Sequence, residues 1–258
     1  MPSLSPVGGV KQAGSLFALF LDVGRMTFKR PFQYREFVQQ AWFVASVTIF
    51  PTMMVAIPFG AVIALELGTL ADQIGAKSFT GSASVLAIVR EASPIVCALL
   101  ISGAGGSAIC ADIGSRKIRD EIDAMEVLGI SAVQRLVVPR VLACMLVSVA
   151  LNGLVCVVGV AGGYFFNVVL QGGTPGAYLA SFSALAQLPD LYAGELKAVV
   201  FGLIAAVVAS YKGLNAGGGP KGVGDAVNQS VVITFLMLFF VNFVMTAVYF
   251  QVVPPKGS

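Results

Sequence analysis

The sequence predicts an all-α integral membrane protein, with an N-terminal interfacial amphipathic helix followed by five transmembrane helices. Hydrophobic residues make up 57% of its 258 residues and charged residues only 11%, and its mean hydropathy is +0.88. Soluble domains carry roughly 25% charged residues, so this chain has too little charge to cover a water-facing surface of its size. Lipid must therefore be a large part of its solvent.

Five apolar runs are long enough to cross a bilayer, which takes about 20 mostly apolar residues. They lie at residues 41–65, 84–111, 136–170, 191–211 and 227–250. We expect one membrane domain over residues 1–258, with an interfacial helix and connector at 12–40 and the spans within 41–250.

The segment before the first span is amphipathic. Between Ser15 and Arg30, apolar residues recur at helical spacing and charged residues fall on another face; the apolar ones are Leu16, Leu19, Phe20, Val23 and Met26. This pattern predicts a helix lying in the membrane interface and ended by Pro31, although an ordinary flanking segment would also fit.

Lysine and arginine predict the orientation of the chain, because they are enriched in cytoplasmic loops. Twelve of them fall on one side of the spans: Lys11, Arg25, Lys29, Arg30, Arg35, Arg116, Lys117, Arg119, Arg135, Arg140, Lys212 and Lys221. Only Lys77 and Lys256 fall on the other side. The N-terminus is therefore expected in the cytoplasm and the C-terminus outside.

The composition argues against several kinds of chemistry. The chain has no histidine, its four cysteines lie in apolar runs, and its net charge of +3 does not suggest nucleic acid. The glycine-rich stretch at 217–224 lacks the spacing of a phosphate-binding P-loop and is expected to form a tight turn. We therefore expect no catalytic residues, no metal and no cofactor on this chain.

Charge is concentrated in the loop between the second and third spans. Eight of the 29 charged residues lie between Asp112 and Glu126. Apolar residues at helical spacing (Ile118, Ile122, Met125 and Leu128) and opposite charges four residues apart predict one amphipathic helix over 112–129, ended by Gly129. It is either a solvated connector or a rigid element that docks on a partner protein.

Four charged residues lie inside predicted spans, where charge is costly: Arg90, Glu91, Glu195 and Lys197. Glu91 and Lys197 lie about equally deep from the outer end of their spans and carry opposite charge, which predicts an ion pair. The pair could serve packing alone, or could lie on the path of a substrate. Asn152 and Asn242 are polar residues in the middle of spans and are expected to bond across helices.

The first and fifth spans carry large, flexible apolar residues. Six of them suit a cavity for acyl chains but would equally suit contact with bulk lipid: Met53, Met54, Leu65, Leu236, Met237 and Phe240.

Six separated motifs occur along the chain: VREASP at 89–94, ISGAGGSAICADIG at 101–114, EIDAMEVLGI at 121–130, RLVVPR at 135–140, ELKAVVFG at 195–202 and the glycine-rich stretch at 211–227. Together and in this order they resemble the MlaE/YrbE permease family, most closely the YrbE permeases of actinobacterial Mce systems. The resemblance covers about residues 32–250.

The resemblance implies the permease subunit of an ATP-driven lipid transporter in the inner (plasma) membrane, importing a fatty acid, sterol or phospholipid. It implies a second YrbE-type permease in a heterodimer, a cytoplasmic ABC ATPase dimer that binds ATP and Mg, and a hexamer of MCE-domain proteins outside. It makes 112–129 the coupling helix, with the ATPase contacted by Arg116, Lys117, Arg119, Asp120, Glu121, Asp123, Glu126 and Gly129. It places Arg90, Glu91, Glu195, Lys197 and Asn242 in the substrate path.

Three other functional classes fit the sequence less well. A secondary transporter or channel usually shows internal repeats, which are not evident here. A lipid-modifying enzyme would need a nucleophile, base or metal set at an interface. A scaffold that only anchors MCE proteins would not need ATPase contacts along 112–129.

Overall fold

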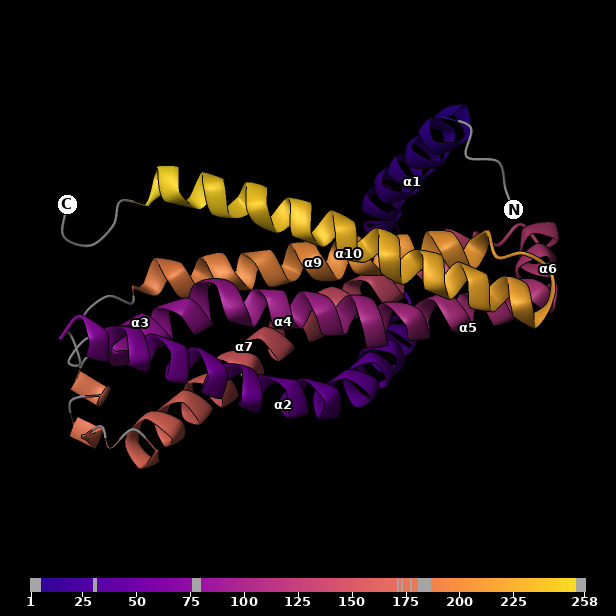
Figure 1. Cartoon of the computed structure of the whole chain (residues 1–258). Coiled ribbons are helices and arrows are strands. Elements are labelled where there is room, and N and C mark those ends of the chain that lie inside the picture. The colour runs from indigo at the N-terminus through magenta and orange to yellow at the C-terminus, as the bar shows by residue number, and fades with distance from the viewer. Residues whose placement is uncertain are drawn as a thin grey trace. The chain divides into compact units, whose positions relative to one another are not determined.

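The computed structural model describes residues 6–29, 32–75, 80–170, 172, 174–176, 178–180 and 187–253, and all its assigned elements are helical (Figure 1). In chain order they are α1 (Pro6–Thr27), α2 (Tyr34–Gln73), α3 (Thr80–Ala87), η2 (Ile88–Ala92), α4 (Ser93–Leu100), η3 (Ile101–Gly105), α5 (Gly106–Ile118), α6 (Glu121–Val127), η4 (Val133–Val137), α7 (Val138–Val169), α9 (Leu188–Leu214) and α10 (Gly219–Val252). The elements named η are single π-helical turns.

Five helical stretches are long and apolar enough to cross a membrane. They are Tyr34–Gln73, Gly81–Ile118, Val133–Val169, Leu188–Leu214 and Gly219–Val252. The predicted fold class and number of spans are confirmed, and the chain is a multi-pass membrane protein. Four spans extend past the predicted apolar run at both ends, because a helix continues through polar residues at the membrane surface that hydropathy does not detect.

The N-terminal helix and the glycine-rich stretch differ from expectation at their ends. Helix α1 begins at Pro6, earlier than predicted, and ends at Thr27. Arg30 and Pro31, at which it was expected to end, lie outside the described residues. The predicted turn at 217–224 is wrong over most of its length, since α10 already begins at Gly219, a residue with φ of +75°.

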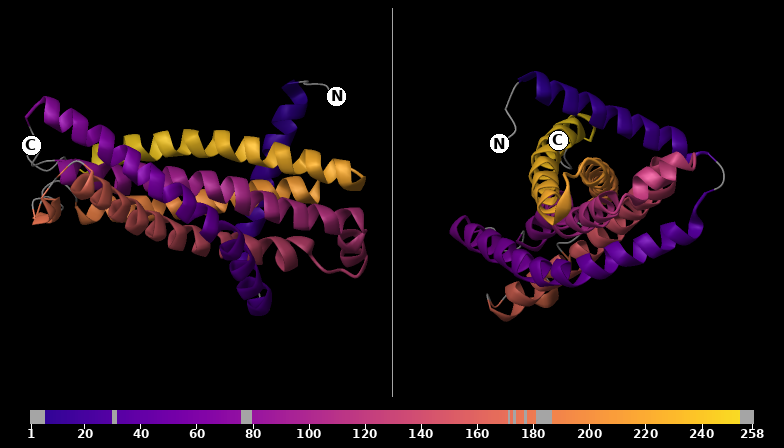
Figure 2. Two further views of the ribbon diagram at one scale, coloured as in Figure 1. Left: turned by 60° about the horizontal axis from the view of Figure 1, so that its bottom comes forward. Right: turned by 90° about the vertical axis from the view of Figure 1, so that its right-hand side faces the viewer.

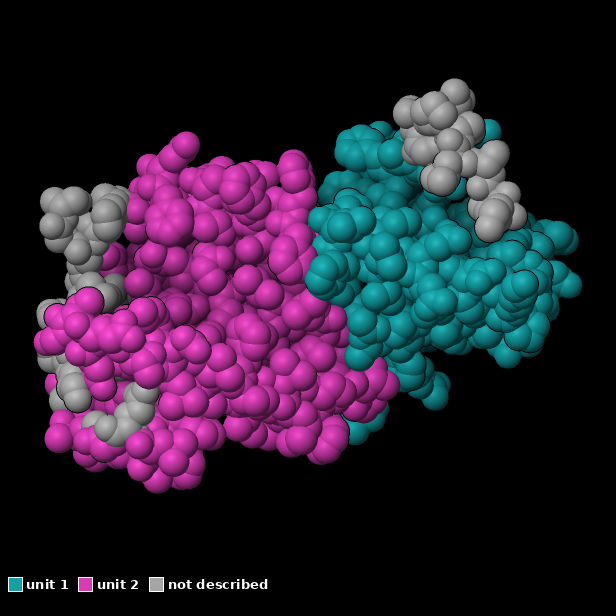
Figure 3. Space-filling view, viewed as in Figure 1, with its two compact units in different colours: residues 1–45, 101–146, 202–237 teal, residues 46–100, 147–201, 238–258 magenta. Residues whose placement is uncertain are grey.

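The chain divides into two compact units (Figure 3). Unit 1 comprises Met1–Ala45, Ile101–Leu146 and Gly202–Met237, and unit 2 comprises Ser46–Leu100, Val147–Phe201 and Leu238–Ser258. Every basic residue assigned to the cytoplasmic side by the charge bias falls within the ranges of unit 1. Lys77 and Lys256, assigned to the opposite side, lie outside the described residues.

In unit 1, closely packed helices support a crosswise N-terminal helix. A Cβ on Gly213 of α9 would lie 2.9 Å from the carbonyl oxygen of Cys110 in α5, so these two backbones are nearly in contact. Helix α1 runs across the unit 1 parts of α9 and α10 instead of alongside them (Figure 2). Leu19 and Val23 of α1 are buried, and the sulfur of Met26 accepts a hydrogen bond from Ser131 just before η4.

In unit 2, glycine again permits close approach of helices. A Cβ on Gly60 of α2 would lie 2.3 Å from the carbonyl oxygen of Gly159 in α7, and one on Gly162 would lie 3.2 Å from that of Ile57. Hydroxyl groups add bonds between helices, because Ser148 Oγ of α7 donates to the Ala198 carbonyl of α9 at 2.8 Å. Small residues and hydroxyls of this kind are the usual means of packing helices in a membrane.

All four cysteines are buried and free of disulfides, as their apolar surroundings predict. Cys97 Sγ donates a hydrogen bond to the Ser148 carbonyl at 3.3 Å, and Cys156 Sγ contacts Ser93 Oγ at 3.2 Å. They serve as small packing residues.

Substitution of Gly60 by alanine should destabilise unit 2. Its methyl group would overlap the backbone of Gly159, and overpacking of this kind typically costs about 1–3 kcal/mol. Gly103→Ala is the matched control, because nothing lies within 4 Å of a Cβ at that position. Thermal unfolding followed by circular dichroism in detergent should show a lower midpoint for Gly60→Ala alone. Equal midpoints for the two variants would contradict the close contact.

Candidate functional sites

Two charged residues of the second span, Arg90 and Glu91, lie in the π-helical turn η2. A π turn inserts one residue into an α-helix, and such turns occur frequently at functional sites. Arg90 and Glu91 are neighbours within η2, and both are partly buried. They bind different partners in unit 2, so two separate polar clusters begin at this one turn.

Glu91 is at the centre of the first cluster. Lys197 Nζ of α9 lies 3.1 Å from Glu91 Oε1 and also donates to Thr246 Oγ1 of α10 at 2.8 Å and to the Arg90 carbonyl at 3.2 Å. The predicted ion pair between Glu91 and Lys197 is therefore confirmed. Lys197 is 2% exposed, so its charge depends on these partners. The sequence did not reveal Thr246, because a single threonine in an apolar span carries no signal.

Arg90 is at the centre of the second cluster. Its Nε and Nη2 donate to Asp190 Oδ1 at 2.9 and 2.6 Å, and Tyr249 of α10 donates its hydroxyl to the same carboxylate oxygen. The guanidinium also lies over the rings of Tyr249 and Phe250, at 5.2 and 5.3 Å from their centroids. Sequence reasoning missed Asp190, although an acidic residue at the start of the fourth span, opposite an unpaired arginine, could have suggested it.

Glu195 lies in a third polar group. Asn152 Nδ2 of α7 donates to Glu195 Oε1 at 3.1 Å, and Ser93 Oγ donates to Asn152 Oδ1 at 2.8 Å. Glu195 Oε2 and Asn242 Oδ1 are buried and have no hydrogen-bond partner among the described residues. Glu195 and Asn242 are thus not part of the two ion-pair clusters, and a role for them in a substrate path stays a prediction.

The six apolar residues predicted to line an acyl-chain cavity lie on α2 and α10. Met53, Met54, Leu236 and Phe240 are between 37% and 69% exposed, and Leu65 is partly buried. Met237 lines a cavity within unit 1. For the other five residues, the structure of the single chain is compatible both with contact to bulk lipid and with lining an acyl-chain cavity.

The charged loop of unit 1 is not the single helix that its spacing predicts. Helix α5 continues from the second span through Asp112 to Ile118, and α6 begins at Glu121. Between them Asp120 adopts a left-handed conformation with φ of 58°, which aspartate tolerates better than most residues. The chain therefore turns a corner at Arg119 and Asp120.

The break changes the ion pairs within the loop. The three pairs predicted at a spacing of four residues (Arg116 with Asp120, Lys117 with Glu121, and Arg119 with Asp123) are wrong. The charged groups instead pair along α5 and across the corner: Arg116 with Asp112 and Glu121, Lys117 with Asp123, and Arg119 with Glu121. These pairs hold α6 against the end of α5.

Helix α6 ends as predicted, and it exposes apolar residues there. Gly129 has φ of +71°, and the amides of Gly129 and Ile130 bond to the carbonyls of Glu126 and Met125, which is a Schellman motif. The predicted apolar stripe is divided, because Ile122 is 2% exposed whereas Leu128 is 73% exposed. Val127 beside it is 88% exposed. Two large apolar side chains thus project from this corner.

A buried arginine lies at the base of the corner. Arg140 of α7 has a fully buried side chain, and its Nη2 lies 2.5 Å from Asp112 Oδ2 and 3.4 Å from Glu36 Oε1 of α2. Its Nη1 donates to the Leu136 carbonyl at 2.7 Å. Sequence reasoning counted Arg140 only as a loop charge, although it joins three helices of unit 1.

Comparison with known proteins places these features in a family. The model of the family described as Permease MlaE matches residues 37–248. The chain belongs to the MlaE permease family. The match contains the η2 turn, the corner of α5 and α6, and the buried Arg140.

Relatives of this MlaE-family permease occur in bacteria and in a plant. A probable ABC transporter permease protein of Rickettsia typhi is 30% identical over 242 residues, 93% of each chain. Another probable ABC transporter permease protein, from Synechocystis, is 35% identical over 192 residues, which is 74% of this chain and 73% of the relative. The chloroplastic protein TRIGALACTOSYLDIACYLGLYCEROL 1 of Arabidopsis thaliana is 28% identical over 179 residues, 69% of this chain and 51% of the relative.

Within the described ranges, no three Cys, Asp or Glu side chains are grouped so that they could hold a metal ion. The polar groups described above bind one another across helices.

Replacement of Arg140 by methionine should destabilise this permease by about 3 kcal/mol. That figure is at the lower end of the cost of breaking a buried ion pair, because Asp112 and Glu36 are about 30% exposed. Arg119→Met is the control, since Arg119 is 58% exposed and a surface pair contributes about 0–1 kcal/mol. Chemical denaturation in micelles measures both. Equal losses would show that Arg140 does not support unit 1.

Proposed function

We propose that this chain is the permease subunit of an ATP-driven lipid transporter of the Mce type, located in the inner membrane and importing its lipid. A charged corner between two spans of an MlaE-family permease, continuous with a helix that the buried Arg140 contacts, is the observation that carries the proposal. The N-terminus and the α5–α6 corner face the cytoplasm, as the distribution of Lys and Arg suggests.

Two observations support the use of ATP hydrolysed by a separate chain. Relatives from Rickettsia typhi and Synechocystis are named probable ABC transporter permease proteins. The sequence contains no P-loop, so ATP and Mg would bind to a cytoplasmic ATPase dimer instead. The permease would take no catalytic part in hydrolysis.

The corner of α5 and α6 is suited to contact that ATPase. Ion pairs across Arg119 and Asp120 hold α6 on the end of the second span, and Arg140 ties the base of α5 to α7 and α2. A push on α6 would therefore reach three helices of unit 1. Val127 and Leu128 are exposed outside the spans, so a partner that covered them would gain the free energy of burying two apolar side chains.

Lipid as the cargo is supported by the family and by one relative. The plant relative bears the name of trigalactosyldiacylglycerol, a lipid with sugar groups. Large apolar side chains such as Met54, Leu236 and Phe240 are exposed on α2 and α10. A second YrbE-type permease covering these helices would enclose an apolar path, and MCE-domain proteins outside would continue it.

The polar clusters of unit 2 would bind or release the polar part of the lipid. Glu91, Lys197 and Thr246 join η2, α9 and α10, and Arg90, Asp190 and Tyr249 join the same three elements. An anionic headgroup could replace Glu91 at Lys197, because the Glu91 side chain is 35% exposed and its carboxylate could turn towards water.

Serine at Val127 and Leu128 should weaken binding of the ATPase. Losing apolar burial worth about 2 kcal/mol, the contribution of one fully buried Val or Leu side chain, should weaken binding by the double variant roughly 30-fold. Ala124→Ser, on the exposed side of the same helix, is the control. Binding of the purified native ATPase to the permease in lipid nanodiscs measures the effect. Unchanged affinity of the double variant would refute the coupling assignment.

Substitutions of Glu91 and Lys197 separate a structural role from a functional one. Glu91→Gln or Lys197→Met alone leaves one buried group without its partner and should destabilise the protein. The double variant removes both charges and should fold. If the pair serves transport, the folded double variant should move lipid at least about tenfold more slowly, a barrier increase of roughly 1.4 kcal/mol. Normal ATP-driven lipid transfer by the double variant would show that the pair serves packing only.

A further inference from the structure

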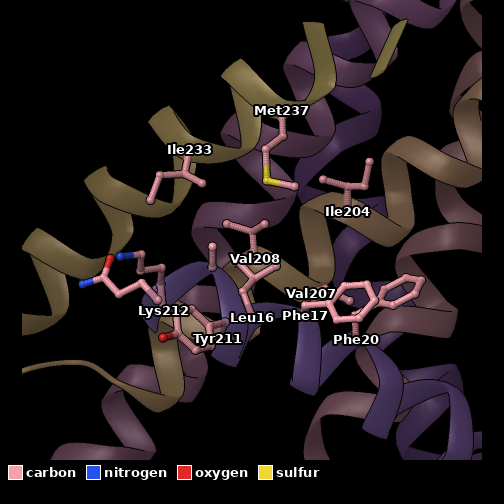
Figure 4. Close-up of a pocket in the computed structure, with 12 residues that line it drawn as sticks. Leu16, Phe17, Phe20, Ile204, Val207, Val208, Tyr211, Lys212, Ile233 and Met237 are labelled. Atoms are coloured by element: carbon pink, nitrogen blue, oxygen red, sulfur yellow. The ribbon is translucent and has the colours of Figure 1, made fainter. Parts of the chain in front are cut away.

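A cavity of about 510 Å³ lies within unit 1, between the N-terminal helix and the helices α9 and α10. Leu16, Phe17 and Phe20 of α1 face Ile204 and Val208 of α9, with Met237 of α10 at one end (Figure 4). This volume lies within the range of about 300–1,000 Å³ that is usual for small-molecule sites. The lining is almost entirely apolar, so the cavity suits a hydrocarbon chain.

A second cavity, of about 320 Å³, shares residues with the first and differs from it in character. Gln12, Tyr211 and Lys212 line both cavities, and the second one continues past Asn215, Asp225 and Gln229. The two cavities together have one apolar part and one polar part. That division matches an amphiphile with a hydrocarbon tail and a polar head, and it fits neither a soluble metabolite nor an apolar helix.

Lys212 determines which head the polar part prefers. The residue is 8% exposed, and its Nζ donates to Gln229 Oε1 at 3.1 Å. Among the described residues no ion pair includes Lys212, although a buried charge normally has a counter-charge. Asp225 also lines the polar cavity, but it is exposed, so solvent screens its charge more strongly than that of the buried Lys212.

Helix α1 is anchored to α9, and part of its aromatic surface remains exposed. Ser15 Oγ and the Tyr211 hydroxyl lie 2.6 Å apart and join α1 to α9 at the junction of the two cavities. Leu19 and Val23 pack inward, whereas Phe17 and Phe20 remain 59% and 40% exposed. A lipid of the surrounding leaflet could therefore insert one chain beneath the aromatic rings.

We propose that these joined cavities bind one phospholipid of the adjacent leaflet, with an acyl chain in the apolar part and an anionic headgroup at Lys212. The site differs from the polar clusters of unit 2, and it would tie the N-terminal helix to the membrane. It does not depend on transport, so it could exist even if the proposed function were wrong.

Tryptophan quenching by brominated phospholipids tests the site directly. The chain has one tryptophan, Trp42, which is 78% exposed and does not line the cavity. Phe20→Trp in a Trp42→Phe background places the fluorophore at the site, and the native Trp42 reports on bulk lipid. Both proteins are measured in full-length form in nanodiscs containing brominated phosphatidylglycerol or brominated phosphatidylcholine.

The tryptophan at position 20 should be half-quenched by phosphatidylglycerol at an about fivefold lower mole fraction than by phosphatidylcholine. A preference of about fivefold corresponds to the binding free energy that one lysine contributes near an anionic lipid. Trp42 should show a much smaller preference. Lys212→Gln should abolish the preference at position 20, and Lys221→Gln, at an exposed lysine outside the cavities, should leave it intact.

Lys212→Arg is the control for misfolding, because this variant should keep both the fold and the preference for phosphatidylglycerol. Equal quenching by the two lipids at position 20, or a preference that survives Lys212→Gln, would overturn the proposal. Complete protection from both lipids would also overturn it, because it would show that protein covers the cavity.

Discussion

Arg140 carries a full positive charge on a side chain that is entirely buried, and the helices around it must satisfy that charge. Asp112 comes from the second span, Glu36 from the first, and Arg140 itself from the third. Such a group is strongly destabilising if one partner is absent, so the three helices of unit 1 are bound to one arrangement. The corner of α5 and α6 lies about two helical turns after Asp112 on the same helix, and its position depends on this contact.

In unit 2, buried charges must also be paired, and there a π-helical turn makes the pairing possible. Two charges that are adjacent in sequence, Arg90 and Glu91, would point about 100° apart on an ordinary helix. In the π-helical turn each of them finds its own partner on α9, and both clusters also include a residue of α10. Burial of charge thus fixes which faces of these helices meet, and small residues such as Gly60 and Gly159 then allow close contact between α2 and α7.

Much of the fold could be predicted because lipid imposes simple rules on sequence. Five apolar runs gave five spans, and Glu91 and Lys197 could be paired from depth and charge alone. The corner at Asp120 could not be predicted from the charge pattern. Opposite charges spaced by four residues occur in a sequence that forms one continuous helix and equally in one that forms two helices with a break. Arg140 was misjudged for a related reason: a count of basic residues treats each of them as solvated, whereas this one is buried.

Asp190 shows another limit of sequence reasoning. Its carboxylate lies 1% exposed beneath Arg90, but in the sequence it appears as an ordinary polar residue at the start of a helix. The contacts of Thr246 and Tyr249 likewise depend on how α10 is rotated, and hydropathy carries no information on rotation. The roles of these residues therefore had to come from geometry.

The π-helical turn at Ile88–Ala92 also affects how the chain can be compared with its relatives. The turn contains one more residue than an α-helical turn, so a relative that lacks one residue there would have an uninterrupted α-helix. Because the π turn absorbs its extra residue, the side chains on either side of the deletion would keep their directions, and only those within the turn would change theirs. A single-residue gap at this place in an alignment would accordingly mark a lineage in which arginine and glutamate have exchanged or lost their partners, even if both letters are retained.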